Sequence, residues 1–142
     1  MKTFTSHSAE ETTDLGRQIA AELKPGSIVL LRGDLGAGKT TMVKGIAEGF
    51  NAADAGDVTS PTFTLIHEYR GPEITLYHID LYRIDTQREL DTLALDDLMD
   101  PKHILLIEWG EKFERFVKER DIEIAIEHLG GDERRVFLKS RA

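Results

Sequence analysis

The sequence predicts a three-layer α/β domain over residues 1–142, with a mixed sheet that is parallel in the middle and antiparallel at its edges. Two apolar runs, 28–31 and 104–107, have the length and composition of strands that are buried on both faces. Directly after a glycine-rich segment that follows the first run, apolar residues recur at helical spacing, which predicts a helix packed on the sheet. These residues are Met42, Val43, Ile46, Ala47 and Phe50.

The edges of the sheet are predicted from two pairs of β-rich segments. The pair 62–69 and 74–80 flanks a short turn, and the pair 121–127 and 134–139 is joined through Gly130, Gly131 and Asp132. Pairs of this kind are typical of antiparallel hairpins.

The remaining helices and connections are also indicated by local patterns. Ser8 and Glu11 have the spacing of a capping box, and the helical pattern after them stops at Pro25 and Gly26. Shorter helices are expected within 86–99 and 112–117, and 51–59 reads as an exposed connection.

Residues 33–40 read Gly-Asp-Leu-Gly-Ala-Gly-Lys-Thr and match the phosphate-binding loop pattern G-x-x-x-x-G-K-[ST]. In such a loop, successive N–H groups face inward as an anion nest, and the positive end of the following helix points at the same place. Lys39 is expected to reach the β- and γ-phosphates, and the Thr40 hydroxyl to bind Mg²⁺. The sequence therefore predicts a P-loop NTPase-like domain that binds a nucleoside triphosphate. The expected nucleotide-binding residues are Gly36, Ala37, Gly38, Lys39, Thr40 and Thr41.

Two carboxylates follow buried strands, and hydrolysis needs such groups to hold Mg²⁺ or its waters and to orient the attacking water. Glu108 ends the most apolar run and Asp80 ends the other strand. Both are expected at the carboxyl edge of the sheet, where open α/β sheets bind ligands. Taken singly, each is equally explained as a strand-end carboxylate that faces solvent.

Three other features of the sequence have open interpretations. Ser60-Pro61-Thr62 is either a switch-like segment that senses the γ-phosphate or a turn that opens a strand. His78 shares a strand face with Asp80 and could form a metal pair, although a structural histidine is the simpler interpretation. Arg134 and Arg135 could contact phosphate or a partner, or be solvated.

Composition excludes several classes of function. The chain has no cysteine, so it can form neither a disulfide nor a thiolate zinc site. It shows no apolar run of membrane-spanning length, and a soluble cytoplasmic protein is expected. Its net charge of −8 and scattered cations indicate a poor nucleic-acid binder. ATP is favoured over GTP because the guanine-reading Asn-Lys-x-Asp is absent, Asn51 being followed by Ala.

The chain resembles the TsaE family, small bacterial ATPases required for forming threonylcarbamoyladenosine in tRNA. The resemblance covers nearly all of the chain and rests on four motifs in the family's order and approximate spacing. These are Gly33-Asp-Leu-Gly-Ala-Gly-Lys-Thr-Thr41, Ser60-Pro-Thr-Phe63, His78-Ile-Asp-Leu-Tyr-Arg83 and Ile107-Glu-Trp109.

The resemblance implies a weak ATP hydrolase that is modulated by partner proteins and uses ATP and Mg²⁺. The implied partner is the transferase, a heterodimer of two related sugar-kinase-like proteins, so tRNA is met only indirectly. The implied roles are a Walker B-like acid for Asp80, Mg²⁺ ligation for Thr40 and Glu108, catalysis for Lys39, and a switch-like segment from Ser60 to Phe63. The sequence leaves open whether Asp80 and Glu108 exchange roles.

Two other functions compete with this one. A small-molecule kinase would use the same loop, with Asp80 as a general base toward an acceptor hydroxyl. A nucleotide-dependent adaptor would use ATP only to set its affinity for a partner.

Overall fold

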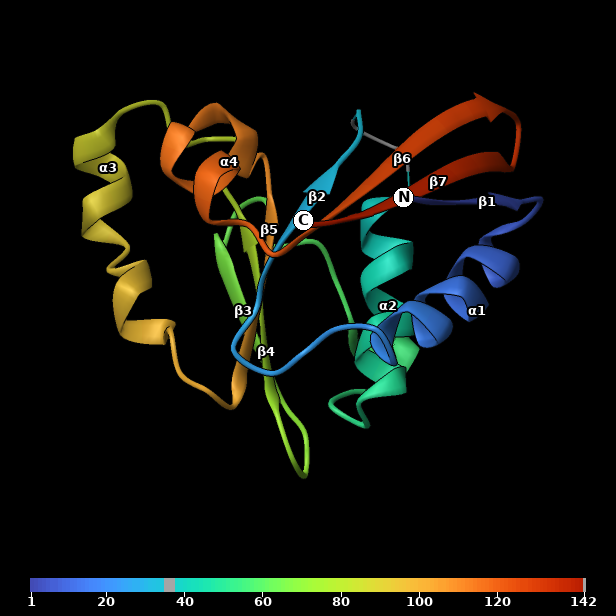
Figure 1. The fold of residues 1–142 in the computed structure, drawn as a ribbon, viewed down its shortest axis with the longest axis horizontal. Coiled ribbons are helices and arrows are strands. Elements are labelled where there is room, and N and C mark those ends of the chain that lie inside the picture. Colours follow the sequence, from blue (N-terminus) through green and yellow to red (C-terminus); the bar gives the residue numbers. More distant parts are fainter. Residues whose placement is uncertain (35–37, 142) are drawn as a thin grey trace.

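The computed structural model describes residues 1–34 and 38–141, and in these ranges the strands form one sheet in the order β1-β7-β6-β2-β5-β4-β3 (Figure 1). The strands are β1 (Lys2–Ser6), β2 (Ile28–Arg32), β3 (Ile66–Arg70), β4 (Thr75–Asp80), β5 (His103–Glu108), β6 (Ile122–Gly130) and β7 (Glu133–Ser140). The α-helices are α1 (Ala9–Ala20), α2 (Lys39–Gly49), α3 (Gln87–Thr92) and α4 (Glu114–Glu119), and the 3-10 turns are η1 (Ala55–Asp57), η2 (Leu95–Leu98) and η3 (Gly110–Lys112).

The middle of the sheet is parallel and its edges are antiparallel, as predicted. Strand β2 lies between β5 and β6 and is parallel to both, and β4 is parallel to β5. Antiparallel pairing then adds β3 at one edge, and β7 followed by β1 at the other. The carboxyl ends of the parallel strands β2, β4 and β5 consequently lie side by side, along the edge of the sheet formed by strand ends.

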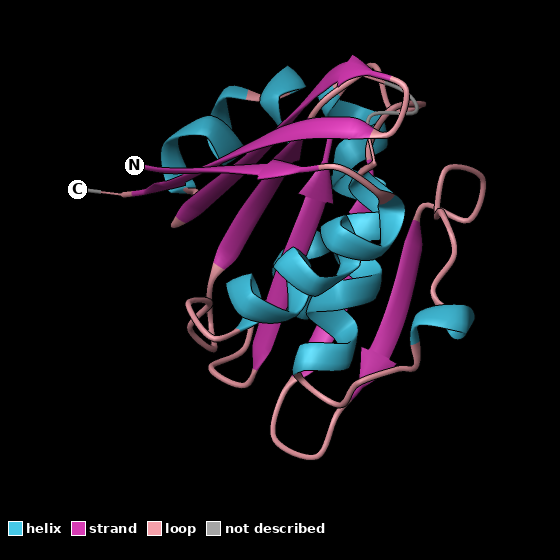
Figure 2. Ribbon diagram, turned by 90° about the vertical axis from the view of Figure 1, so that its right-hand side faces the viewer, coloured by secondary structure: helices cyan, strands magenta, loops and turns pink. Residues whose placement is uncertain are grey.

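Helices cover both faces of the sheet and enclose two cores, which confirms the three-layer prediction. Figure 2 shows α1 and α2 against one face, and α3 and α4 lie beyond the other (Figure 1). Along β2, Val29 and Leu31 belong to the core under α1 and α2, whereas Ile28 and Leu30 belong to the other core. Burial on both faces is why this strand reads as a continuous apolar run.

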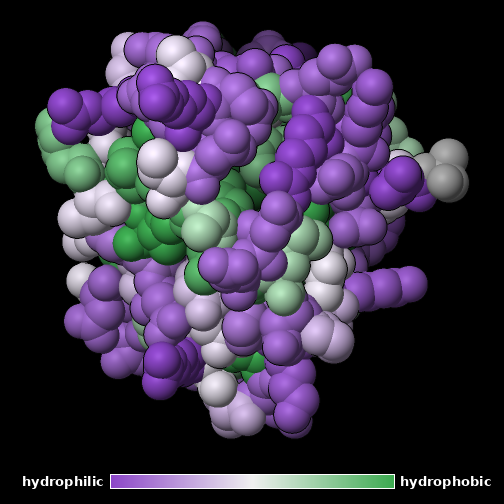
Figure 3. Space-filling model, turned by 90° about the vertical axis from the view of Figure 1, so that its left-hand side faces the viewer, coloured by the Kyte–Doolittle hydropathy of each residue, from purple (hydrophilic) through white to green (hydrophobic). Residues whose placement is uncertain are grey.

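The second core has the thinner cover. Helices α3 and α4 have only six residues each, so Leu93, Leu98 and Ile66 beside this core remain partly exposed. The surface seen from this side is mostly hydrophilic and includes a hydrophobic area (Figure 3).

The structure departs from the predicted strands at two places. The unpredicted β1 pairs with β7, and it was missed because a short, half-exposed edge strand carries little apolar signal. The strand predicted to begin at Thr62 begins at Ile66 instead. Leu65 has a positive φ of 71°, and its N–H donates to the Pro61 carbonyl at 2.6 Å, so 62–65 form a turn.

The capping box predicted at α1 is half confirmed. The Ser8 hydroxyl accepts from the Glu11 N–H at 3.0 Å, as expected for an N-cap. The Glu11 carboxylate reaches back to the N–H of His7 at 2.9 Å, one residue before the cap.

Within the described residues, no helix combines the length and apolar character needed to cross a membrane.

Helices α1 and α2 approach so closely that their contact admits only glycine. A Cβ at Gly45 would lie 1.9 Å from the Thr13 carbonyl oxygen and 2.9 Å from the Cα of Gly16. A Cβ at Gly16 would in turn lie 2.5 Å from the Met42 carbonyl oxygen. These contacts involve backbone atoms, so relief requires a shift of a whole helix.

We therefore expect Gly45→Ala to destabilise the fold by at least roughly 1–3 kcal/mol, even though alanine is the better helix former. The melting temperature should fall by roughly 3–10 °C, measured by circular dichroism. Gly56→Ala is the control, because nothing lies within 4 Å of a Cβ at Gly56. Equal melting temperatures for the two variants would contradict the close packing.

Candidate phosphate-binding site

A pocket of about 290 Å³ lies where the carboxyl ends of the central strands face the start of α2. It gathers segments that are far apart in the sequence: the start of α2, the turn before β3, the ends of β4 and β5, and the start of β7. The lining residues are Gly38, Lys39, Thr40, Thr41, Ser60, Thr62, Asp80, Glu108 and Arg134. Three residues of the predicted loop, Leu35, Gly36 and Ala37, lie outside the described residues.

The start of α2 gives the pocket a positive end. Gly38 precedes the helix with φ of 109° and ψ of 18°, a left-handed conformation that glycine adopts without strain. The first turn of an α-helix leaves N–H groups without intrahelical acceptors and carries a partial positive charge. The first turn of α2 contains no acidic side chain that would neutralise this charge.

Lys39 is a buried cation that contacts a backbone carbonyl, a carboxylate and an aromatic ring. Its Nζ donates to the Gly33 carbonyl oxygen at 2.7 Å and lies 3.6 Å from Glu108 Oε1. It also lies 4.4 Å from the centre of the Trp109 ring. A buried ammonium needs such compensation, and the Glu108 carboxylate supplies the opposite charge.

Asp80 and Glu108 are paired neighbours at the ends of two parallel strands. They occupy matching positions in the register of β4 and β5, and both are buried. The structure thus places the two predicted carboxylates side by side at the edge of the sheet that faces α2, rather than in solvent. Two adjacent buried carboxylates repel each other, so each needs its own donors.

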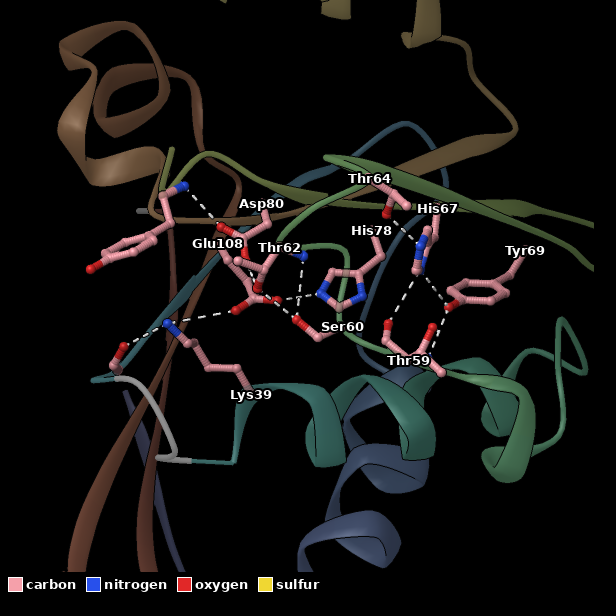
Figure 4. A network of polar contacts seen from close by, with 12 residues as sticks. Lys39, Thr59, Ser60, Thr62, Thr64, His67, Tyr69, His78, Asp80 and Glu108 are labelled. Carbon is pink, nitrogen blue, oxygen red and sulfur yellow. Dashed lines mark hydrogen bonds and ion pairs between the residues drawn. The ribbon is translucent and has the colours of Figure 1, made fainter. Parts of the chain in front are cut away.

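Asp80 receives its hydrogen bonds from backbone and from hydroxyl groups. Its Oδ1 accepts from the N–H of Tyr82 at 2.8 Å, and its Oδ2 accepts from the Thr62 hydroxyl at 2.9 Å. The Thr62 hydroxyl lies 2.8 Å from the Ser60 hydroxyl, which continues this chain of hydrogen bonds toward the surface. Because Thr62 donates to Asp80, Ser60 is the donor in the second contact (Figure 4).

His67 contacts the two residues that flank the switch-like segment, Thr59 and Thr64, whereas Phe63 at the end of the segment is exposed. His67 lies 2.6 Å from the Thr64 hydroxyl and 3.2 Å from the Thr59 carbonyl oxygen (Figure 4). Pro61 is buried, whereas Phe63 is 82 % exposed and lies 5.3 Å below the Arg83 guanidinium. The segment therefore has a buried proline and an exposed aromatic ring two residues apart.

Glu108 receives a hydrogen bond from a histidine. His78, two residues before Asp80 on the same face of β4, lies with Nε2 2.5 Å from Glu108 Oε2 and has no exposed surface (Figure 4). His78 therefore pairs with Glu108, and a metal pair with Asp80 is not what this geometry offers. Among the described residues, no three His, Asp or Glu side chains are grouped so that they could hold a metal ion alone.

Arg134 lies near the C-terminal end of the chain and lines the same pocket as Lys39. Its Nη1 donates to the carbonyl oxygens of Gly131 and Glu133 at 2.8 and 3.0 Å, and its Nε lies 3.6 Å from the position of a Cβ on Gly38. Arg134 shares the strand face of Val136, which belongs to the core under α2, and Arg135 points to the other face. This alternation was the available signal, but it does not show which face meets the loop.

Trp109 joins the site to the exposed surface. Its ring lies 5.2 Å from the ring of Tyr82, and Tyr82 is 44 % exposed. Trp109 also has a positive φ of 63°, rare for a bulky residue. The tryptophan thus packs between the buried lysine and a surface tyrosine.

A family model and individual relatives of the chain agree on one protein family. The family model described as "Threonylcarbamoyl adenosine biosynthesis protein TsaE" matches residues 6–136. Proteins named tRNA threonylcarbamoyladenosine biosynthesis protein TsaE from Bacillus subtilis and Treponema pallidum are 41% and 35% identical to the chain. The matches cover 89% and 94% of this chain, and 78% and 96% of those proteins.

A solved structure agrees with these matches. The crystal structure of YdiB from Bacillus subtilis superposes with a TM-score of 0.76 and is 34% identical in sequence. The match covers 99% of this chain and 86% of that one. On the family match, the sequence identities and the shared fold, the chain belongs to the TsaE family.

Proposed function

We propose that this chain binds and hydrolyses Mg-ATP, and thereby sustains the turnover of the heterodimeric transferase that forms threonylcarbamoyladenosine in tRNA. The observation that carries the proposal is one pocket in which a buried lysine at the start of α2 faces two buried strand-end carboxylates. Membership of the TsaE family supports the place in tRNA modification.

The triphosphate is held by positive groups that converge on the pocket. The nearest carboxylate oxygen that the described residues offer Lys39 is Glu108 Oε1 at 3.6 Å, so a phosphate oxygen can replace the Gly33 carbonyl as its acceptor. The N-terminus of α2 favours the same anion. Arg134 adds a second cation from the start of β7, close to Gly38 at the N-terminus of α2.

The oxygen donors of the pocket fit Mg²⁺. This ion prefers carboxylate, hydroxyl and phosphate oxygens, keeps several waters and needs only one or two carboxylates from the protein. Thr40 and Glu108, which both line the pocket, would hold it. When bound, it neutralises charge on the phosphate oxygens.

Asp80 is the group best placed to orient the attacking water. Both of its oxygens accept hydrogen bonds, which holds the carboxylate in one orientation at the pocket wall. One of these bonds comes from Thr62, so the position of the Ser60–Thr62 segment is coupled to that of Asp80. A γ-phosphate that draws these hydroxyls toward itself would therefore also change the contacts of Asp80.

The same segment offers a way to report the nucleotide state to the transferase. Phe63 follows Thr62 directly and is almost fully exposed, so a shift of Thr62 moves an aromatic side chain on the surface. The net charge of −8 disfavours direct binding of the tRNA backbone. Docking on a protein that itself holds tRNA is consistent with both features.

The first prediction separates binding from hydrolysis. Asp80→Asn and Glu108→Gln keep the size of the side chain and remove its charge, so each should lower the ATPase rate by about two orders of magnitude or more. ATP should still bind to both variants in calorimetry. Lys39→Ala should instead weaken ATP binding by about 10–150-fold, since charge-assisted contacts contribute about 1.5–3 kcal/mol each. Normal hydrolysis by both carboxylate variants would refute the assignment.

The second prediction concerns Arg134. Arg134→Gln should weaken ATP binding by about 5–10-fold, because it removes a cation at the rim of the pocket where solvent screens the charge. The matched control is Arg135→Gln, on the opposite face of β7, where the guanidinium lies 4.0 Å from Glu127. Titration calorimetry with ATP measures both, and equal affinities for the two variants would remove Arg134 from the site.

The third prediction tests the cellular role in a reconstituted transfer assay with tRNA and the transferase heterodimer. We expect several rounds of threonylcarbamoyl transfer per transferase only when wild-type protein and hydrolysable ATP are both present. Asp80→Asn should support association but not repeated turnover. An equal yield with Asp80→Asn would show that hydrolysis is irrelevant, and tight binding of tRNA by the isolated chain would contradict the indirect role.

A further inference from the structure

The His78–Glu108 pair is a polar contact deep in the structure that phosphate binding alone does not require. His78 has no exposed surface, and its Nε2 lies 2.5 Å from Glu108 Oε2. In the register of the sheet, His78 lies opposite Leu106 and Asp80 lies opposite Glu108. The imidazole on β4 therefore reaches diagonally to Glu108 on the adjacent strand β5. Only a side chain with a donor at this distance from the backbone can make the contact.

The second ring nitrogen identifies which atom carries the proton. Within the part of the chain that the structure describes, Nδ1 of His78 is buried and has no hydrogen-bond partner. An orphaned N–H donor in the interior is costly, whereas a lone pair on a neutral nitrogen costs less. A ring with its proton on Nε2 and none on Nδ1 therefore fits these contacts, and the Nε2 proton is donated to Glu108.

The two oxygens of Glu108 consequently have different surroundings. Oε2 is occupied by the imidazole N–H, while Oε1 faces Lys39 Nζ at 3.6 Å on the pocket side. Without the histidine, the carboxylate could rotate so that both oxygens turn to the lysine or toward the pocket. The negative charge of Glu108 would also repel that of Asp80, its neighbour on the adjacent strand.

We propose that His78 is a positioning residue that fixes the Glu108 carboxylate, so that only Oε1 is presented to the nucleotide and its metal ion. This inference rests on the proposed hydrolysis of Mg-ATP and adds a residue to it. Donors behind a metal-binding carboxylate set its orientation, and their loss commonly costs about 10–100-fold in metal affinity or activity. His78 acts through Glu108 and does not touch the substrate.

Variants that differ in the donor and its reach test the proposal. His78→Leu fills a similar volume without a donor, His78→Gln carries an amide N–H close to the position of Nε2, and His78→Asn carries one that is a bond too short. His103→Gln is the control, because this half-buried histidine sits at the other end of β5 and donates to the Leu98 carbonyl. Melting temperatures are recorded for all variants.

We expect His78→Leu and His78→Asn to lower kcat for ATP hydrolysis by about 10–100-fold and to raise the Mg²⁺ concentration needed for half-maximal rate. His78→Gln should recover most of the rate, and ATP affinity without Mg²⁺ should stay within about twofold of wild type. His103→Gln should leave the Mg²⁺ dependence unchanged. If His78→Leu does not fold, the comparison of the two amide variants still decides the question.

The double variant separates positioning from general structural support. Because His78 acts through Glu108, adding His78→Leu to Glu108→Gln should lower the rate no further than about twofold. A loss as large as in the wild-type background would overturn the proposal. A wild-type rate and Mg²⁺ requirement in His78→Leu would overturn it as well.

A spectroscopic test stands apart from hydrolysis. In ¹⁵N-histidine NMR of the intact protein, the signals absent from His78→Gln should show a protonated Nε2 and a bare Nδ1, and Glu108→Gln should shift the Nε2–H signal. A bare Nε2 would overturn the proposal. If the protein hydrolyses no ATP but this signature is present, the proposed function fails while the positioning of Glu108 stands.

Discussion

The buried ammonium of Lys39 is the constraint on which the site depends. A lysine with only 5 % of its side chain exposed needs a negative partner for its ammonium, and Glu108 at the end of β5 is the acidic group beside it. That partner requires β5 to end level with the start of α2, which follows from the parallel pairing of β2 with β5. The order of the central strands therefore also determines which carboxylate balances the charge of Lys39.

The sequence predicted the parts of the fold that local patterns determine. Apolar runs mark the central strands because burial on both faces removes any polar alternation, and the carboxylates at 80 and 108 follow from where such strands end. Strand β1 was missed because an edge strand is stabilised by one neighbour, β7, that lies more than a hundred residues away in the chain. The turn at 62–65 was read as strand because its β-branched and aromatic residues favour extended structure, whereas the positive φ of Leu65 depends on tertiary contacts.

The site was predictable as a set of residue types but not as a set of contacts. The loop motif identifies Lys39 and Thr40, yet it carries no information on Arg134, which reaches the pocket through the register of a hairpin. Similarly, the spacing of His78 and Asp80 places both on one strand face, and two interpretations of the histidine were open. The partner of His78 depends on the register between β4 and β5, and a sequence without that register does not specify it.

The two carboxylates of the site stand in different surroundings, and this difference supports different roles. Glu108 is bonded by a fully buried ring and faces a buried lysine, so its orientation is set by the core. Asp80 is bonded by a hydroxyl from an exposed segment, which continues through Ser60 to the surface beside Phe63. A change in that segment alters the donors of Asp80 and leaves those of Glu108 in place. Paired acids with unlike environments can divide their work. Under the proposed function, Asp80 is therefore the carboxylate whose contacts a partner would change, whereas the contacts of Glu108 lie in the core.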